Sequence, residues 1–266
     1  MTKGRLRVSA ASGTVQSIER ALSLLEALGE CRGEIGLAEL GKRVSLHAST
    51  THRILATLVA RGYARQKGET SRYALGAKAL HLGESYLGQM DLRRVIRPAL
   101  EQLSHETGET ATLVILDRRE ALYLDKVESP QSLRIFSRIG RRAPLHCTAV
   151  GKVLLAFRPK GEAEVLLGRG PLERLARHTI TSATQLRREL EKVRDQGFAL
   201  DREECEEGAC CIAVPVRNAQ GEVEAALGIS APTTRLAPRR VEDLIPIMLR
   251  TGREVSAQLG YSGLTR

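Results

Sequence analysis

A run of short polar and basic side chains lies where an apolar helical pattern begins. The run is Ser49, Thr50, Thr51, His52 and Arg53, and the apolar residues of segment 49–61 then recur at helical spacing. We therefore predict a helix that is polar at its N-terminal end and apolar towards its C-terminal end. In helix-turn-helix proteins, the N-terminal residues of the recognition helix face the base edges of the major groove. An arginine can bind guanine through two hydrogen bonds, and a threonine methyl group can touch thymine. We expect all five residues of the run to contact DNA.

The segments around this helix are typical of a winged helix. A helix is predicted over 15–28, with an apolar stripe that we expect to be its packed face: Val15, Ile18, Leu22, Leu25 and Leu28. A short second helix is predicted over 37–44, and Gly62 is expected to end the third helix in the left-handed conformation. Residues 63–75 follow as strand, turn and strand. We expect this hairpin to be the wing and to contact phosphates or the minor groove through Arg65, Lys67 and Arg72.

The distribution of charge supports a nucleic-acid partner for this first part of the chain. The net charge is +10, and residues 1–76 hold 12 Lys and Arg against 6 Asp and Glu. More than half of the excess therefore lies in less than a third of the chain, and a phosphate backbone is the usual partner of such a surplus. A basic surface that only aids solubility, or a helical module that binds another protein, would fit the same residues. An unchanged operator affinity of Arg53→Ala would remove Arg53 from the DNA-contacting set.

The remaining composition favours a cytoplasmic protein. No apolar run approaches the length of a membrane span, and residues 1–13 are basic without a following apolar stretch, so we expect a disordered leader and no membrane contact. Five cysteines are an odd number, which argues against a disulfide framework and for a reducing compartment.

The second part of the chain has the pattern of an α+β domain. We predict a linker helix over 77–91 that pairs with a copy of itself through Leu80, Leu87 and Met90, then a helix over 91–107. Strands are predicted over 110–116, 121–127, 133–138, 198–201, 210–217 and 222–230. Helices are predicted over 148–157, 161–167, 186–196 and 238–259, the third of them opened by a capping box at Ser182. Because no βαβ unit repeats, we expect a sheet with helices on it that holds something small.

Two kinds of chemistry compete with simple ligand binding. His146 and the cysteines at 147, 205, 210 and 211 could in principle bind zinc, but their spacing matches no ligand template, and adjacent residues of a strand point to opposite faces. Cys147 lies just before a predicted helix and could be a nucleophilic thiol of an enzyme. We expect no catalytic residue, no metal site and no cofactor, and we keep the thiol-dependent enzyme as a distant alternative.

Ordered motifs along residues 14–261 resemble the IclR (isocitrate lyase regulator) family of bacterial transcriptional regulators. They include the segments at 15–22, 49–58 and 144–152, followed by those at 197–204, 211–216 and 230–232. The resemblance implies a winged helix-turn-helix domain over 14–76, a dimerising linker over 77–91 and a GAF-like effector-binding domain over 92–262. It also implies a homodimer, or a dimer of dimers, on a palindromic double-stranded DNA operator.

The resemblance further implies a pocket for a small carboxylate effector. The family's pocket positions correspond here to Ala143, Ala149, Val150, Gly151, Asp201, Ala209, Cys211, Gly228 and Ser230. Many family members carry Ser-x-Ser on the last strand, whereas this chain has Gly228 before Ile229 and Ser230. One hydroxyl is thereby lost, which puts a ligand contact at position 228 in doubt.

Within the family, the chain is most similar to the branch of 2-keto-3-deoxygluconate repressors. The residues that carry this similarity lie at 125–127, 133–142, 206–208 and 256–261. A keto sugar acid is therefore the expected effector, with aromatic acids and glyoxylate or pyruvate as alternatives. Arg134 or Arg141 could pair with its carboxylate, and either could equally be a solvated charge.

Overall fold

A computed structural model describes residues 15–31, 33–68, 71–88, 91–159, 161–168 and 170–263. The chain divides into two compact units, Met1–Gln89 and Met90–Arg266, each with its own core. Among the described residues, no helix combines the length and apolar character needed to cross a bilayer. The expected leader over 1–13 and the expected pairing residue Met90 lie outside the described residues.

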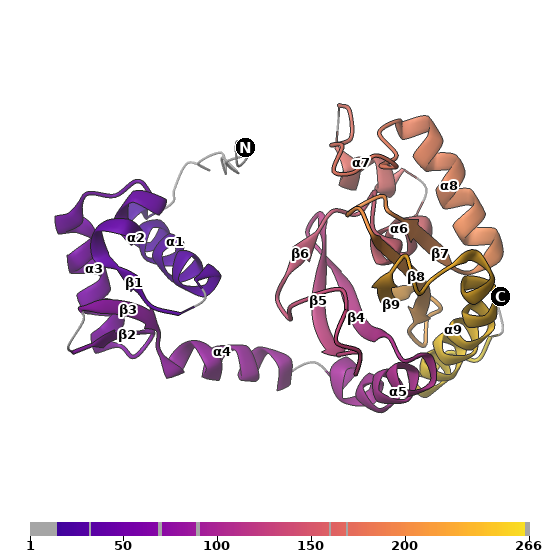
Figure 1. Cartoon of the computed structure of the whole chain (residues 1–266), viewed down its shortest axis with the longest axis horizontal. Coiled ribbons are helices and arrows are strands. Elements are labelled where there is room, and N and C mark those ends of the chain that lie inside the picture. The colour runs from indigo at the N-terminus through magenta and orange to yellow at the C-terminus, as the bar shows by residue number, and fades with distance from the viewer. Residues whose placement is uncertain are drawn as a thin grey trace. The chain divides into compact units, whose positions relative to one another are not determined.

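The first unit is a winged helix followed by the helix α4 (Figure 1). Its elements are α1 (Gln16–Glu30), β1 (Ile35–Gly36), α2 (Leu37–Arg43), α3 (Ala48–Ala60), β2 (Ala64–Lys67), β3 (Arg72–Leu75) and α4 (Ala77–Gly88). The three strands form an antiparallel sheet in the order β1-β3-β2. Gly62 follows α3 at φ +77°, and the amide of Tyr63 donates to the carbonyl of Leu58, as expected for a left-handed helix end.

The packed face of α1 differs from the predicted stripe. Leu24, Ala27 and Leu28 are buried, whereas Val15, Ile18 and Leu22 are more than half exposed. Helical spacing identifies apolar stripes, but only the neighbouring elements decide which stripe is covered. In α1 the C-terminal half packs against α3 and β3, and the N-terminal stripe is left uncovered within this unit.

The second unit is a six-stranded antiparallel sheet in the order β6-β5-β4-β9-β8-β7. The strands are β4 (Thr110–Asp117), β5 (Glu120–Val127), β6 (Arg142–Ala143), β7 (Ala199–Arg202), β8 (Ala209–Arg217) and β9 (Val223–Pro232). The helices are α5 (Asp91–Thr107), α6 (Ala149–Ala156), α7 (Glu162–Leu167), α8 (Ala183–Gln196) and α9 (Pro238–Gln258). Apolar residues of α5 and α9 pack on one face of the sheet, and those of α6 and α8 pack on the other (Figure 1). The predicted α+β class is confirmed.

One predicted strand is absent. Residues 133–138 form an irregular segment instead of a strand, and Leu133 and Phe136 are exposed. The strand next to β5 at this edge is β6, which pairs Ala143 with Ala121 and Arg142 with Leu122. Two of the strands, β1 and β6, are only two residues long and left no alternating pattern in the sequence.

The turn between the wing and α4 leaves no room for a side chain at Gly76. A Cβ atom there would lie 2.2 Å from the carbonyl oxygen of Gly62 and 3.0 Å from that of Ala64. We predict that Gly76→Ala lowers the free energy of unfolding by about 1–3 kcal/mol. Gly83→Ala is the control, because that helical position has open space and should gain about 0.5–1 kcal/mol. Scanning calorimetry of the full chain measures both, and equal effects of the two changes would contradict the prediction.

Candidate functional site

The outward face of α3 carries four of the five residues predicted to read DNA. Ser49, His52 and Arg53 are exposed and Thr50 is half-buried. Thr51 is different, because it is fully buried and its hydroxyl donates to the carbonyl of His47 at 3.0 Å. Its Oγ1 lies 2.9 Å from where a Cβ at Gly41 would be, so Thr51 sits at the close approach of α2 and α3. The expected DNA contact of Thr51 is therefore wrong, and this residue positions the helix.

The hairpin presents its three basic residues on one face. Arg65 and Lys67 are two residues apart on β2, and Lys67 lies opposite Arg72 on β3. All three are exposed, and Lys67 lies 4.0 Å from Glu34. The wing therefore offers a cationic surface of the kind that contacts DNA phosphates.

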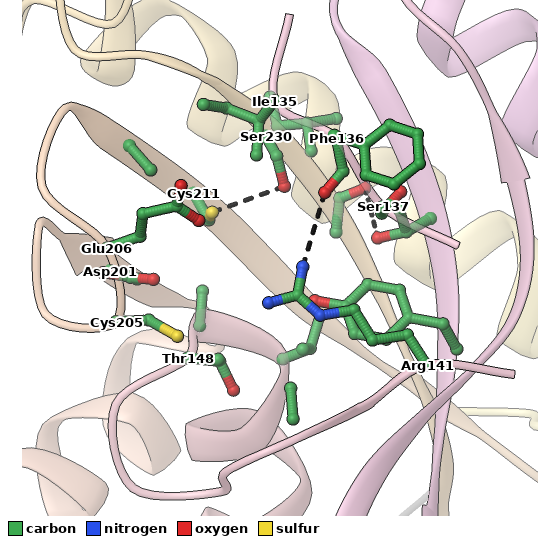
Figure 2. Close-up of a pocket in the computed structure, with 18 residues that line it drawn as sticks. Ile135, Phe136, Ser137, Arg141, Thr148, Asp201, Cys205, Glu206, Cys211 and Ser230 are labelled. Carbon is green, nitrogen blue, oxygen red and sulfur yellow. Dashed lines mark hydrogen bonds between the residues drawn. The ribbon is translucent and has the colours of Figure 1, made fainter. Parts of the chain in front are cut away.

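The second unit contains a cavity between its sheet and the start of α6 (Figure 2). It has about 550 Å³ of empty space when the open solvent at its mouth is included. One wall is the irregular segment 133–141, here called the strap, which contributes Ile135, Phe136, Ser137 and Arg141. Figure 2 shows Asp201, Cys205 and Cys211 on the opposite side.

Eight of the nine predicted effector positions line this cavity, and Gly151 does not. The eight are Ala143, Ala149, Val150, Asp201, Ala209, Cys211, Gly228 and Ser230. At Gly151, a Cβ atom would lie 2.4 Å from the carbonyl oxygen of Leu145, so this glycine is required by the packing of the loop before α6. Its amide donates to the hydroxyl of Thr148, the N-cap of α6.

Thr112 lies close to Gly228, the position at which many family members carry a serine. A Cβ at Gly228 would lie 2.9 Å from Val150 Cγ1 and 3.0 Å from Thr112 Oγ1. The Thr112 hydroxyl donates to the carbonyl of Gly228 and lines the cavity. The Thr112 hydroxyl of β4 therefore lies close to position 228, where a Cβ atom would crowd it.

Positive potential enters the cavity from two directions. The amides of Ala149 and Val150 belong to the first turn of α6, whose N-terminus attracts anions. Arg141 lines the cavity and donates to the carbonyl of Phe136 at 3.3 Å. Arg134 pairs instead with Glu128 and does not line the cavity. Of the two arginines considered for an anionic ligand, only Arg141 is in position.

Asp201 is the acidic group at the floor of the cavity. It is 2% exposed, and burial raises its pKa to about 7 although the amide of Glu204 donates to Oδ1 at 2.8 Å. Near neutral pH it is therefore a mixture of a carboxylate and a neutral acid that can donate a hydrogen bond. In either state it can bind a hydroxyl group, but only the neutral acid can donate a hydrogen bond to a keto oxygen.

A buried lysine holds the loop that carries Asp201. Lys152 is fully buried, with its Nζ 2.6 Å from Glu204 and 3.5 Å from Glu189. Burial raises the pKa of Glu204, and Lys152 opposes that rise. Since Glu204 also donates its amide to Asp201, the ion pair fixes the position of the cavity floor.

Cys147 does not have the properties of a nucleophilic thiol, although its hydrogen bond with Cys205 lowers the pKa of Cys205. Cys147 is buried, and both its hydrogen bond with Cys205 and its burial raise its pKa above that of an ordinary thiol. The thiol of Cys211 donates to the hydroxyl of Ser230 at 3.3 Å, and burial raises its pKa as well. Within the described residues, no three His, Cys, Asp or Glu side chains are grouped so as to hold a metal ion.

Several cavity residues were not anticipated from the sequence. They are Thr112, Tyr123, Ile135, Phe136, Ser137, Thr148, Cys205, Glu206 and Ile229. Thr112 and Tyr123 face the cavity because of the register between β4 and β5, which includes a bulge. Thr148 had a signal, since a threonine before an apolar run is a typical N-cap that lies at a helix N-terminus.

The fold and these two sites define a regulator with a DNA-reading winged helix and a separate ligand-binding unit. Comparison with known proteins gives the family. Residues 17–68 match the IclR helix-turn-helix domain, and residues 84–257 match the bacterial transcriptional regulator IclR C-terminal domain. The chain belongs to the IclR family, and it is a DNA-binding transcriptional regulator and not an enzyme.

Individual relatives are similar over almost the whole chain. The HTH-type transcriptional regulator KdgR of Escherichia coli is 42% identical over 93% of this chain and 94% of its own. The crystal structure of IclR from Thermotoga maritima has a TM-score of 0.79 at 31% identity, covering 92% and 99% of the two chains. An IclR homolog from Microbacterium hydrocarbonoxydans, complexed with 4-hydroxybenzoate, has a TM-score of 0.78 at 27% identity, covering 91% and 98%.

The ion pair behind the cavity gives a stability prediction. Lys152→Met would leave Glu204 buried without its partner, and we expect a loss of about 3–5 kcal/mol in the free energy of unfolding. Adding Glu204→Gln should restore part of that loss, because no buried charge then remains unpaired.

Lys192→Met is the matched control, since this lysine is 71% exposed and lies 4.0 Å from Glu189. It should change stability by no more than about 0.5 kcal/mol. Urea unfolding of the four proteins measures these differences. A double variant no more stable than Lys152→Met would show that Lys152 does not act through Glu204.

Proposed function

We propose that this protein is a repressor whose binding to its operator is controlled by a small carboxylate, most specifically a keto sugar acid. The observation that carries the proposal is the cavity, where Arg141 and the N-terminus of α6 favour a carboxylate while Asp201 and Thr112 offer groups for hydroxyls. The similarity of the chain to the 2-keto-3-deoxygluconate repressor branch supports the same class of ligand. The five free cysteines support action in the reducing cytoplasm.

An aromatic acid is the second candidate. Tyr123 and Phe136 line the cavity, and one structurally similar family member is complexed with 4-hydroxybenzoate. An aromatic ring would pack against these side chains, and its carboxylate would use the same positive groups. Glyoxylate or pyruvate is a third, smaller carboxylate that uses those groups without filling the cavity.

We further propose a homodimer, or a dimer of dimers, on a palindromic operator. A single winged helix reads few base pairs, so twofold symmetry doubles the contacts. Uncovered leucines support this proposal, because Leu80 and Leu82 of α4 and Leu22 of α1 are all more than half exposed. Among the residues expected to pair, Leu80 is thus uncovered, and the side chain of Leu87 lies outside the described residues.

A thermal-shift screen of the full chain tests the effector. The compounds are 2-keto-3-deoxygluconate, glucuronate, 4-hydroxybenzoate, glyoxylate and pyruvate. Specific binding raises the melting temperature with ligand concentration. Stabilisation by the keto sugar acid alone is the expected result. Stabilisation by 4-hydroxybenzoate alone would replace the sugar acid with the aromatic acid.

The DNA-reading assignment predicts unequal effects of basic residues on operator binding. Arg53→Ala should weaken binding of a selected operator about 10- to 100-fold, as expected for loss of a two-hydrogen-bond contact to guanine. Lys67→Ala should weaken binding to the operator and to unrelated DNA by similar factors, because a phosphate contact carries no sequence information.

Arg188→Ala is the matched control, because it removes the same charge from an exposed position on α8 in the other unit. Fluorescence anisotropy at two salt concentrations measures all three variants. If Arg188→Ala lost as much operator affinity as Arg53→Ala, the loss in Arg53→Ala would be explained by the change in net charge and not by a DNA contact.

The raised pKa of Asp201 predicts pH-dependent effector binding. Below about pH 7 the side chain is mostly neutral and above it mostly charged, so an anionic effector should bind more weakly as the pH rises from 6 to 8. One linked proton limits the change to about tenfold per pH unit. By the same linkage, the empty protein loses stability as the pH rises through 7, because its folded-state pKa lies above the unfolded value.

Titration calorimetry with 2-keto-3-deoxygluconate measures the affinity. Asp201→Asn should bind with a flat profile over this range, since its amide does not titrate. An identical pH profile in the variant would place the titrating group elsewhere.

A further inference from the structure

Two neighbouring residues of β5, Asp125 and Lys126, make polar contacts on opposite faces of the sheet. A register shift between Leu113 and Val114 pairs Leu113 with Asp125 and Val114 with Tyr123. Leu124 is left without a partner, so the shift is a bulge, which changes the alternation of the side chains that follow. Asp125 opposes Leu113, which packs with α5, whereas Lys126 opposes Thr112, which lines the cavity.

On the cavity face, Lys126 holds the strap. Its Nζ donates to the carbonyl of Ser137 at 2.7 Å and lies 5.3 Å from the centre of the Phe136 ring. It also pairs with Glu128 at 2.6 Å, and Glu128 in turn pairs with Arg134 of the strap. Because Phe136 and Ser137 line the cavity, Lys126 is the direct support of that wall.

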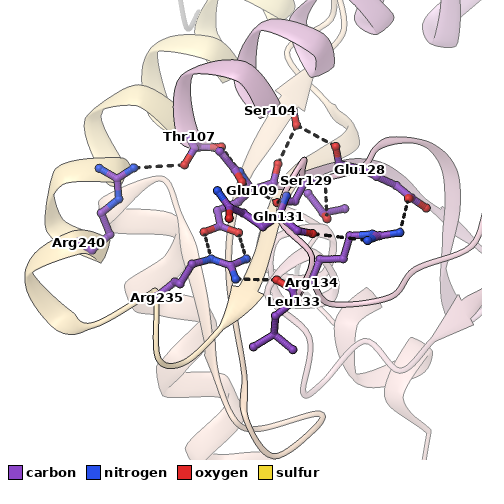
Figure 3. A network of polar contacts seen from close by, with 12 residues as sticks. Ser104, Thr107, Glu109, Glu128, Ser129, Gln131, Leu133, Arg134, Arg235 and Arg240 are labelled. Atoms are coloured by element: carbon purple, nitrogen blue, oxygen red, sulfur yellow. Dashed lines mark hydrogen bonds and ion pairs between the residues drawn. The ribbon is translucent and has the colours of Figure 1, made fainter.

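Besides Lys126, which holds the middle of the strap, Arg235 anchors the N-terminal end of the strap. Figure 3 shows Arg235 between Glu109 and the strap, with Nη1 donating to the carbonyl of Leu133 at 2.6 Å. Arg235 also makes two hydrogen bonds to the Glu109 carboxylate, at 2.6 and 2.8 Å. The other end is held by the amide of Gly140, which donates to the carbonyl of Tyr123. With both ends anchored, movement of the wall is concentrated at the middle, where Lys126 holds it.

On the other face, Asp125 holds α5. Its side chain is fully buried, with Oδ1 3.0 Å from Nη1 of Arg97 and Oδ2 3.1 Å from Nε of Arg93. Oδ1 also accepts the backbone amide of Lys126, and Nη1 of Arg97 donates to the carbonyl of Lys126. The peptide unit of Lys126 is therefore bound directly to the ion pairs that fix α5. A buried carboxylate with two arginines tolerates little displacement.

We propose that Asp125 and Lys126 form a coupling element through the sheet, by which the state of the cavity wall is transmitted to α5. This helix begins at Asp91, directly after the division of the chain between Gln89 and Met90. The inference rests on the proposed function in taking the cavity as the effector site. Any ligand that displaces Phe136 or Ser137 acts on the Lys126 side chain, and the Lys126 peptide group acts on Arg97 and Asp125. Such a ligand favours one arrangement of α5 over another, as allosteric control requires.

Hydrogen–deuterium exchange of the full-length protein tests this coupling without any effector. Lys126→Met removes the side-chain contact with the strap and leaves the backbone contacts of residue 126 with Arg97 and Asp125 in place. It should nevertheless accelerate amide exchange in both 133–139 and 91–107. Asp125→Asn removes the charge on the α5 face and should accelerate exchange in the same two segments. We expect about tenfold in the distant segment, equivalent to about 1.4 kcal/mol. The double variant should show less than the product of the two single effects.

Two controls separate coupling from unfolding. Lys192→Met makes the same chemical change at an exposed position and should leave both segments unchanged, and Lys126→Arg should keep most of the protection because it retains a donor and a cation. Acceleration confined to the substituted face, or equal acceleration in α8, would overturn the proposal. A failed ligand screen would instead overturn the proposed function and leave this result standing, so the two failures are distinguishable.

Discussion

The structure of the effector unit depends on the requirement that a charge buried against the sheet must have a partner. The sheet is covered by helices on both faces, so water cannot solvate the ionisable groups inside it. Lys152 and Glu204 satisfy each other beneath the cavity, and Asp125 is satisfied by two arginines of α5. These pairs fix backbone as well as side chains, because Glu204 and Lys126 also use their amides on neighbouring carboxylates. The cavity floor and the cavity wall are therefore both positioned by ion pairs that lie outside the cavity.

Asp201 is the exception to this requirement, and its position explains why. Its Oδ1 accepts a backbone amide, but among the described residues no ion pair joins it to a cation, since Lys152 pairs with Glu204 and Glu189. Its pKa rises instead, to about 7, so the group avoids the cost of a buried charge by binding a proton. A group in that condition is able to exchange its proton for a ligand's hydrogen bond. The ion pairs of Lys152 and Asp125 thus support the fold, whereas Asp201 remains available to a ligand.

Local sequence signals predicted most of the fold and much of the site, while contacts between distant segments decided the remainder. The caps at Ser182 and Gly62 and the alternation in β4, β5, β8 and β9 located elements to within a few residues. A strand was expected over 133–138 of the strap, but this segment is irregular, and the strand at that edge of β5 is β6, which pairs with Ala121 and Leu122. Thr51 has the chemistry of a DNA contact, and only the close approach of Gly41 shows that it faces inward. In the same way, no spacing in the sequence indicates that Thr112 lies beside Gly228 at the cavity.

The bulge at Leu124 shows how a small irregularity can carry a function that a regular strand could not. In a strictly alternating strand, Asp125 would share the face of Tyr123 and point towards the cavity, and Lys126 would point towards α5. An acid in place of Lys126 would repel both Glu128 and an anionic ligand, and a lysine among Arg93 and Arg97 would be a buried, unpaired cation. The extra residue exchanges these positions and gives each face the charge it can bind. Because a bulge is specified by pairing across β4 and β5, its consequence is local in space but depends on the pairs Leu113–Asp125 and Val114–Tyr123, which join separate strands. The regulator's DNA-reading unit lacks such a device within its described residues, where exposed cations on α3 and the wing face outward to a partner. The two units therefore use charge in opposite ways: the first leaves cations exposed on α3 and the wing, and the second pairs its buried charges internally.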